Sequence, residues 1–329
     1  MARGALLPSA GRTRASVWMF AGLLALAVGY LLALSEAAYV ALLGAYGAYT
    51  GLLTWLTVRL TAPVPASRAA PAAPPWRLRL QLAVIGGVLL FTGLPALAPP
   101  PWTALVERAA AMGERLLPAA WVGDGGNALA NPLQYFAIPL LAMLLFGARP
   151  AELGLGRGWR VGRVCALWLA LPLLIWAVLI TFGQLPLQTL VRRLIGNTLQ
   201  NGFFEEFLLR GALQTRLERL LALVDALVLQ ALVFGLWHIE ANTRMMDGNL
   251  LAGLAVCVAS QTVSGLCLGL VFRRTGSLVA PTVAHVAMNA LGQSFAQRRL
   301  IKVDPQGSRD RELPPPAERL LLPRLTHWR

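Results

Sequence analysis

The sequence predicts an all-α fold, a polytopic transmembrane helical bundle with about eight or nine membrane helices. Of the 329 residues, 57% are hydrophobic and 13% are charged, and soluble domains carry about twice that charged fraction. The mean hydropathy is +0.60. Apolar runs of membrane length recur from residue 17 to residue 296. Because these runs are continuous rather than alternating, they argue against a membrane β-barrel.

The N-terminal part, residues 1–194, is expected to supply about five membrane helices joined by Pro/Arg-rich loops. These helices are expected at 17–34, 37–58, 80–98, 133–148 and 164–182. Arginines before the first run resemble a secretory signal, but the run is long and a second follows at once, which favours a membrane helix. Five prolines predict a loop over 59–79. Residues 102–118 predict a surface helix, and 185–200 an amphipathic or re-entrant piece.

Residues 195–298 form the predicted functional core. Its four helices are expected at 201–223, 225–238, 250–272 and 276–296. Two arginines, Arg273 and Arg274, lie between the third and the fourth of these helices. Residues 299–329 are charged and proline-rich, which predicts a disordered tail.

The net charge of +14 predicts contact with a membrane rather than with nucleic acid. The arginines lie in short loops between apolar runs, where they orient helices and meet anionic lipid headgroups. No basic patch carries the interleaved aromatics of a single-strand binder. Since arginine, alanine and leucine dominate, we expect an integral protein of a bacterial inner membrane. Cys165, Cys257 and Cys267 are scattered in apolar stretches and predict buried thiols rather than disulfides.

Two adjacent glutamates, Glu205 and Glu206, lie in a segment that otherwise reads as a membrane helix. An ionisable group at membrane depth costs about 2.5–3.5 kcal/mol on insertion scales, so such groups mark function. Glu206 and Arg210 are spaced i and i+4, in the favourable order for an ion pair. Glu205 points about 100° away, which leaves its carboxylate free to act. The alternative is that both glutamates cap a helix N-terminus and face the interface.

Histidines follow on two later segments. His238 ends the apolar stretch 231–238, and His285 and Asn289 share one face of the last run because they are four residues apart. Taken singly, His238 reads as an interfacial histidine and the other two as an interhelical hydrogen-bonding pair. Taken together, three helices each contribute a polar group, and this favours a common site.

A carboxylate and two imidazoles can work in two ways. Glu205 can act as the general base for a water molecule, or Glu205, His238 and His285 can hold a metal such as zinc. Asn289 and a histidine can donate hydrogen bonds to an oxyanion. Both arrangements indicate hydrolysis of a carbonyl compound, most simply a peptide bond. We expect no cofactor, with zinc as the alternative, because no acidic residue within a helical turn of His285 can orient that ring.

Three short motifs carry a resemblance. Glu-Glu-x-x-x-Arg at 205–210, Phe-x-x-x-His at 234–238 and His-x-x-x-Asn at 285–289 occur in this order on successive apolar segments. They resemble the signature of the CAAX-protease and bacteriocin-processing (CPBP) family of intramembrane proteases, also called Abi or Rce1-like. The stretch 276–281 also resembles the approach to the last motif of that family. The resemblance covers about residues 195–298.

The resemblance implies a glutamate-dependent intramembrane endopeptidase that acts on a membrane-associated protein or peptide. The site residues that it implies are Glu205, Glu206, Arg210, His238, His285 and Asn289. Glu205 would activate the water with help from His238, and the ion pair next to it would support the site. His285 and Asn289 would stabilise the oxyanion. The family has also been described as metal-dependent, so the zinc alternative stays open.

Other classes of membrane protein fit the sequence less well. A transporter could use the same polar residues as an ion path, but no paired repeat with broken helices is visible. An inactive scaffold need not keep the complete set of motifs. A serine-type rhomboid lacks its nucleophile motif, and a metallopeptidase of the HExxH type lacks that sequence.

Overall fold

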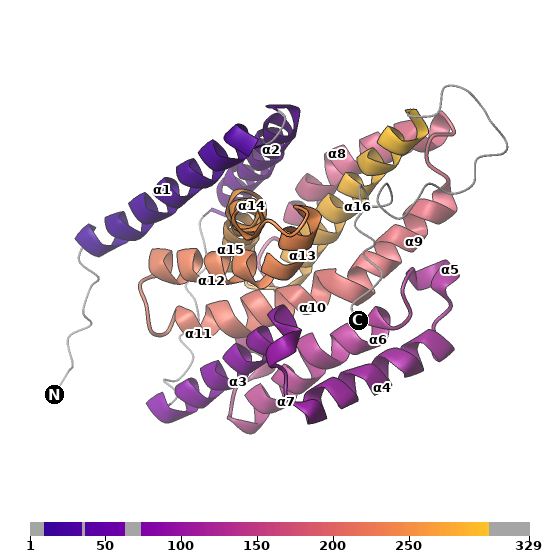
Figure 1. Cartoon of the computed structure of the whole chain (residues 1–329). Coiled ribbons are helices and arrows are strands. Elements are labelled where there is room, and N and C mark those ends of the chain that lie inside the picture. The colour runs from indigo at the N-terminus through magenta and orange to yellow at the C-terminus, as the bar shows by residue number, and fades with distance from the viewer. Residues whose placement is uncertain (1–9, 35–36, 63–73, 303–329) are drawn as a thin grey trace.

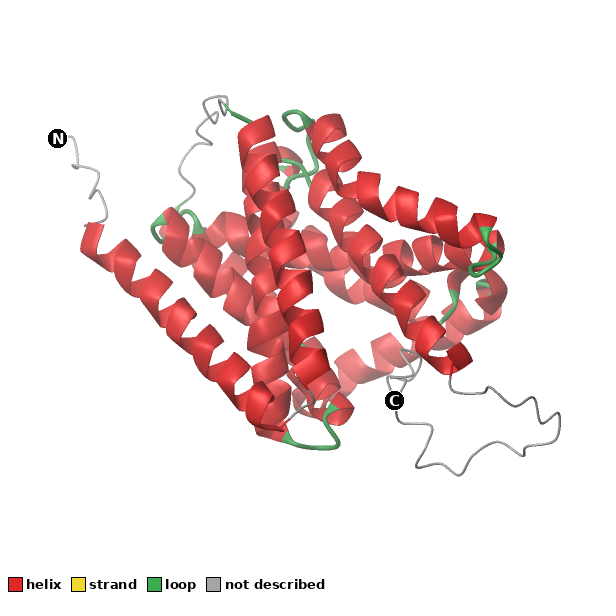
Figure 2. Cartoon of the chain, turned by 90° about the horizontal axis from the view of Figure 1, so that it is seen from above, coloured by secondary structure: helices red, strands yellow, loops and turns green. Residues whose placement is uncertain are grey.

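The computed structural model describes residues 10–34, 37–62 and 74–302. Within these ranges the chain forms helices joined by turns and short loops, with no strand (Figure 2). The predicted all-α class is therefore confirmed.

The N-terminal helices largely follow the predicted runs. They are α1 (Ala10–Leu34), α2 (Ala37–Leu60), α3 (Pro75–Gly93), α4 (Pro100–Leu116), α5 (Ala119–Val122), α6 (Asn127–Pro132), α7 (Ile138–Leu145) and α8 (Val161–Thr181). The end of the loop expected over 59–79 is wrong: Pro75 begins α3, where its missing N–H costs nothing. Residues 63–73 of that loop lie outside the described residues. The π-helical turn η2 (Leu133–Ala137) joins α6 to α7, so this span begins earlier than expected.

The C-terminal helices carry the predicted functional core. They are α9 (Leu187–Asn197), α10 (Phe203–Glu206), α11 (Thr215–Leu217), α12 (Leu223–Trp237), α13 (Ile239–Met245), α14 (Leu250–Val256), α15 (Val263–Thr275) and α16 (Val279–Lys302). Three π-helical turns lie between them: η4 (Thr198–Gly202), η5 (Phe207–Gln214) and η6 (Cys257–Thr262). Because α16 continues to Lys302, the tail expected from residue 299 is helical over its first four positions. The rest of that tail lies outside the described residues.

Residues 187–217 form one continuous helix, here called the central helix. It joins α9, η4, α10, η5 and α11 without a non-helical residue, and Figure 1 shows α9, α10 and α11 aligned end to end. The break expected near residue 200 is therefore wrong. The sequence predicted an amphipathic or re-entrant piece over 185–200 and a separate helix from residue 201, yet the backbone at Asn197 and Gly202 keeps right-handed helical angles. The predicted domain boundary at 194/195 falls inside this helix.

The central helix runs through the middle of the bundle. In Figure 1, α3, α4, α6 and α7 lie on one side of it, and α12 to α16 lie on the other. The hairpin of α1 and α2 packs at the edge, against α14 and α15. Phe207, Leu208 and Leu209 of the central helix are fully buried in the largest apolar cluster. Residues just before this buried segment are thereby held at the centre of the molecule.

The described residues contain five helices that are long and apolar enough to cross a membrane. These are Ala15–Leu34, Tyr39–Leu60, Asn127–Leu145, Val161–Thr181 and Leu250–Thr275. The pair α12 and α13, bent by 49°, makes a sixth if it counts as one span. The predicted number of eight or nine is not confirmed. The central helix and α16 do not meet the criterion, because charged and polar residues interrupt their apolar runs.

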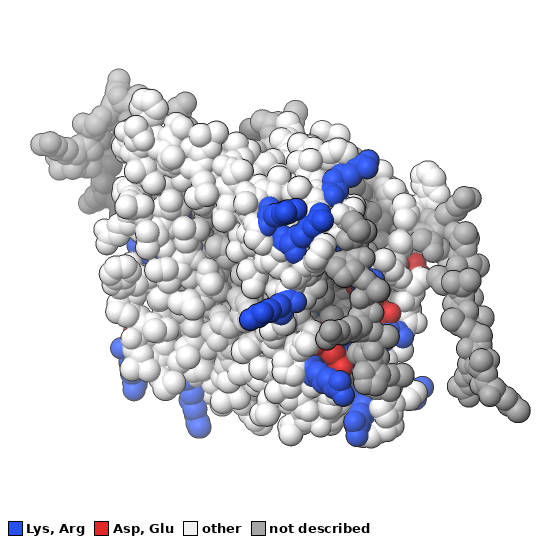
Figure 3. Space-filling model, turned by 180° about the vertical axis from the view of Figure 1, so that it is seen from behind, with Lys and Arg blue, Asp and Glu red and all other residues white. Residues whose placement is uncertain are grey.

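Large apolar side chains on the surface agree with a lipid environment. Trp18, Leu26 and Leu145 are exposed by 74%, 73% and 74%. Figure 3 shows a broad part of one face without charged side chains, and most basic side chains gather elsewhere on that face. Such a surface would be unfavourable in water but matches the hydrocarbon core of a bilayer.

Candidate active site

The two glutamates lie in the interior of the central helix, on α10. The π-helical turns η4 and η5 flank this short segment, and π-turns inside helices often occur at functional sites. Glu205 and Glu206 are 6% and 0% exposed. The alternative in which they cap a helix N-terminus at an interface is therefore wrong. A buried carboxylate needs partners, since desolvation of its charge is costly.

Glu206 has two partners. Its Oε1 lies 3.0 Å from Nη1 of Arg210, which confirms the predicted ion pair. The same oxygen accepts a hydrogen bond from Nδ1 of His285 at 2.9 Å. Arg210 is fully buried, donates to the carbonyl of Gly265 at 3.3 Å and lies over the ring of Phe234. Glu206 therefore neutralises one buried cation and orients one imidazole.

His238 lies at the bend between α12 and α13, with φ −92° and ψ 10°. Its Nδ1 donates to the carbonyl oxygen of Phe234 at 2.8 Å, which leaves Nε2 pointing to other partners. The bend is held to α3, because Nε1 of Trp237 donates to Oγ1 of Thr92 at 2.8 Å. A methyl group at Gly93 would meet the Trp237 ring at 2.6 Å, so this contact depends on a glycine.

The three predicted groups meet at one oxygen atom. Oε2 of Glu205 lies 4.0 Å from Nε2 of His238 and 3.9 Å from Nε2 of His285. Both rings use Nδ1 as a donor, so the neutral imidazoles present lone pairs at Nε2. Oε2 of Glu205 is buried and has no hydrogen-bond partner among the described residues. Three acceptors that converge without a donor fit a bound water molecule or an added proton between them.

These groups line a cavity of about 540 Å³. Glu205, His238, His285 and Asn289 all reach it, so the structure brings together every predicted residue except the buried pair behind them. Sequence reasoning missed other polar residues in its wall, among them Tyr46, Thr50, Asn197, Asn201, Ser264 and Gln293. Asn201 and Asn197 precede Glu205 by four and eight residues, so they share its side of the helix, and this spacing could have identified the two asparagines. Tyr46 and Thr50 come from α2, and nothing in the sequence links α2 to this site.

The described residues do not fit a metal site well. No group of three His, Cys, Asp or Glu side chains among them is placed to hold a metal ion. Two ligands about 2.1 Å from one tetrahedral zinc lie about 3.4 Å apart, whereas the nitrogens here lie 4.0 and 3.9 Å from Glu205. One argument against zinc was nevertheless wrong. His285 does have an acidic partner, Glu206, which comes from another helix.

The fold and this cavity define a helical membrane protein with a glutamate–histidine site. Residues 187–291 match the family model described as type II CAAX prenyl endopeptidase Rce1-like. The match runs from the start of the central helix into α16 and contains all six predicted site residues. This segment is therefore similar to a family of proteases, and the resemblance seen in the sequence is confirmed. Comparison with curated proteins and with solved structures found no significant match.

Proposed function

We propose that the protein is an intramembrane endopeptidase in which Glu205 activates a water molecule to hydrolyse a peptide bond. The substrate is a membrane-associated protein or peptide, and the setting is a bacterial inner membrane. One observation supports this proposal above the others. Oε2 of Glu205 is buried, has no hydrogen-bond partner in the described part of the chain, and lies about equally far from the Nε2 atoms of two oriented histidines at the wall of a cavity.

The mechanism uses the groups that face the cavity. A water molecule donates one hydrogen to Oε2 of Glu205 and the other to Nε2 of His238. As its oxygen attacks the carbonyl carbon, Glu205 takes the first proton as general base. The tetrahedral intermediate then collapses, the C–N bond breaks, and protonated Glu205 returns this proton to the leaving nitrogen. The water is consumed, and the products are a carboxylic acid and an amine.

The oxyanion needs hydrogen-bond donors. The amide of Asn289 supplies one, since it lines the same cavity. His285 supplies a second from Nε2 when its ring carries both protons, and the carboxylate of Glu206 at Nδ1 stabilises that cation. Such preorganised donors act where charge develops in the transition state. Arg210 holds the carboxylate of Glu206 in place at 3.0 Å and does not line the cavity.

The experiment compares cleavage of natural membrane proteins by the wild type and by Glu205→Gln. Both full-length proteins are purified and incubated in proteoliposomes with membrane proteins extracted from the expression host. Terminal proteomics then records new peptide termini. We expect new termini with the wild type alone, several of them inside or beside apolar segments. The same termini in both samples, or none in either, would contradict the proposal.

A further inference from the structure

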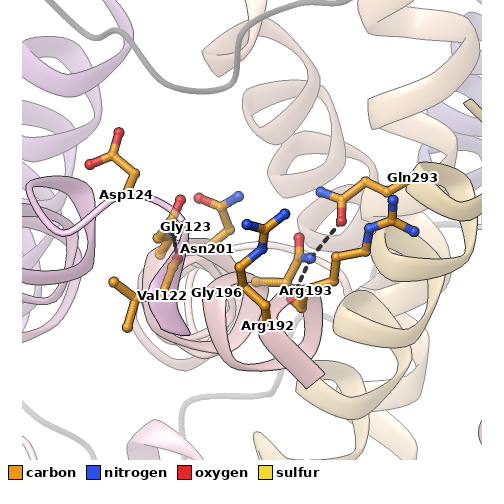
Figure 4. Close-up of a pocket in the computed structure, with 10 residues that line it drawn as sticks. Val122, Gly123, Asp124, Arg192, Arg193, Gly196, Asn201 and Gln293 are labelled. Carbon is orange, nitrogen blue, oxygen red and sulfur yellow. Dashed lines mark hydrogen bonds between the residues drawn. The ribbon is translucent and has the colours of Figure 1, made fainter. Parts of the chain in front are cut away.

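A second cavity adjoins the catalytic cavity. It has a volume of about 300 Å³ and shares Asn197, Asn201 and Gln293 with the larger one. Figure 4 shows Arg192 and Arg193 rising from α9 into this space, with Gln293 facing them from α16. The mechanism above uses neither arginine.

Two facing rows of polar side chains connect the second cavity to the catalytic carboxylate; we call them the polar seam. Residues spaced four apart form the row on the central helix: Arg193, Asn197, Asn201 and Glu205. The row on α16 has the same spacing: His285, Asn289 and Gln293. Nδ2 of Asn197 donates to Oε1 of Gln293 at 3.1 Å, which joins the rows where the cavities meet. An extended peptide placed along the seam would find amide partners on both sides.

Among the described residues that line it, the second cavity has an excess of positive side chains. Arg192 is exposed and has no hydrogen bond or ion pair within the described part of the chain, and Arg193 donates to Oγ of Ser294 at 3.1 Å. Burial, and then the charge of Arg192, lower the pKa of Arg193. Asp124 also lines the cavity, but its two oxygens accept hydrogen bonds at 2.8 and 3.0 Å from Asn127. These three ionisable side chains carry a net charge of one positive unit.

We propose that the second cavity binds a carboxylate group of the peptide substrate. This inference rests on the proposed function, because it assigns the substrate a place along the polar seam. A guanidinium group binds a carboxylate through two parallel hydrogen bonds, and one negative charge balances the net charge of the cavity. The phosphodiester of a phospholipid also carries one negative charge, but the polar seam that leads from this cavity to Glu205 offers amide partners, which suit a peptide backbone and not an acyl chain. The observations therefore favour a peptide over a phospholipid headgroup.

The polar seam also sets the distance between the bound carboxylate and the peptide bond that is cut. Residues 193 and 205 are twelve apart, which is about 18 Å along a helix that rises about 1.5 Å per residue. An extended peptide advances about 3.3 Å per residue. The carboxylate therefore lies about five residues from the bond that is cut. It is either a chain terminus or an Asp or Glu side chain at that distance.

The test measures binding in the inactive full-length Glu205→Gln protein, so it does not require turnover. The probe is a mixture of random nonapeptides, half with a free C-terminal carboxyl group and half amidated and isotope-labelled. Mass spectrometry of the retained peptides gives the ratio of acid to amide and the enrichment of Asp and Glu at each position. We expect peptides with a carboxylate, either a free C-terminus or an Asp or Glu side chain, to be retained about tenfold more than peptides with a neutral group at the same position. A charge-assisted hydrogen bond has about that effect on binding.

Adding Arg192→Gln should bring this ratio close to one, and Arg192→Lys should restore part of it. Arg115→Gln, at the end of α4, is the matched control and should leave the ratio unchanged. Enrichment of free termini alone identifies a terminal carboxylate, and enrichment of Asp or Glu in both halves identifies a side chain. A ratio near one before Arg192 is changed, or no retained peptide, would overturn the inference. If vesicles that contain phosphatidylglycerol displace the bound carboxylate peptides, and neutral vesicles do not, the lipid headgroup would be favoured instead.

Discussion

Adjacent glutamates at the centre of the molecule differ in what their carboxylates touch. Glu206 binds Arg210 and His285, whereas Oε2 of Glu205 faces the cavity without a hydrogen-bond partner among the described residues. A helix places neighbouring residues about 100° apart, so one turn can present one carboxylate to the core and the other to a cavity. The pair thereby separates the support of the site from its chemistry.

Glu205→Gln should lower cleavage by about 100- to 10,000-fold, the range that a general base contributes. Glutamine keeps the size of the side chain but cannot accept the proton. Combining it with His238→Ala should add little, because residues that act as one unit lose activity non-additively. Cleavage rates of the single and double variants in detergent measure this, with the exposed Glu107→Gln as control. Near-normal activity in Glu205→Gln would refute the glutamate mechanism.

Glu206→Gln should destabilise the protein by about 3–5 kcal/mol, because it leaves the buried charge of Arg210 without its partner. A second change, Arg210→Met, should recover much of that stability, since it removes the buried cation. It should not recover cleavage, because His285 still lacks the carboxylate that orients its ring. Thermal unfolding and cleavage are measured on the same preparations. Recovery of both properties together would show that Glu206 serves the fold alone.

At the scale of elements, close helix packing fixes where His238 lies. Gly235 precedes it by one turn on α12, and a methyl group there would collide with Oγ1 of Thr262 and lie 2.8 Å from the carbonyl oxygen of Cys257. Both contacts come from η6, a π-helical turn. No hydropathy pattern reveals such a turn, because its extra residue per turn changes the backbone but not the composition.

Gly235→Ala should therefore cost about 1–3 kcal/mol through overpacking and should reduce cleavage by displacing His238. Gly44→Ala is the control, because no atom would lie within 4 Å of its added methyl group. Thermal unfolding and cleavage assays compare the two variants with the wild type. Equal effects of both changes would show that α12 can move without loss of function.

The sequence predicted the helices, and the residues that meet at the cavity, better than it predicted their connections. Long apolar runs identify helices because hydrophobicity is a local property, and the pair Glu206–Arg210 follows from spacing within one turn. The contact between Glu206 and His285 joins two helices far apart in the chain, and nothing in either segment specifies it. The continuous central helix was missed because the polar residues over 197–201 interrupt the apolar pattern, so that 185–200 and 201–223 were predicted as separate pieces.

At the scale of the whole molecule, one end is basic. Arg219 pairs with Glu152 at 2.9 Å, and Nη2 of Arg274 donates to the carbonyl of Val58 at 2.6 Å. The first contact joins the end of the central helix to the segment between α7 and α8, and the second joins the ends of α2 and α15. Other basic residues at these ends and in the loops next to them are Arg59, Arg77, Arg160 and Arg273. Because arginine-rich loops stay on the cytoplasmic side, we expect this end to face the cytoplasm.

Cysteine labelling tests this orientation. Leu155 is next to the basic end, because the carbonyl of Gly154 accepts a hydrogen bond from the N–H of Leu278, which lies just after the end of α15. Leu250 begins the span Leu250–Thr275 at its far end. In a background without the natural cysteines, Leu155→Cys should react only after the membrane is permeabilised. Leu250→Cys should react with an impermeant maleimide in intact spheroplasts. Labelling of both sites in the same compartment would contradict the expected orientation.

We expect cleavage to persist after metals are removed, because the separations around Glu205 suit a bridging water better than a shared zinc ion. The wild type is treated with a strong chelator, dialysed, and assayed for cleavage and for bound metals by elemental analysis. Glu205→Gln provides the inactive baseline. Activity that disappears and then returns with one equivalent of zinc would favour the metal-dependent alternative.

Tyr46 and Thr50 of α2 belong to the wall of the catalytic cavity, yet α2 lies far outside the segment that matches the protease family. Tyr46 even accepts a hydrogen bond from Ser264 of α15 at 3.2 Å, so the two parts of the wall are joined. Selection can therefore alter the wall by changing α2 while the reacting groups stay the same. The cavity wall is thus encoded in two separate stretches of the gene, and an exchange of the hairpin of α1 and α2 would change part of this wall without changing the groups around Glu205.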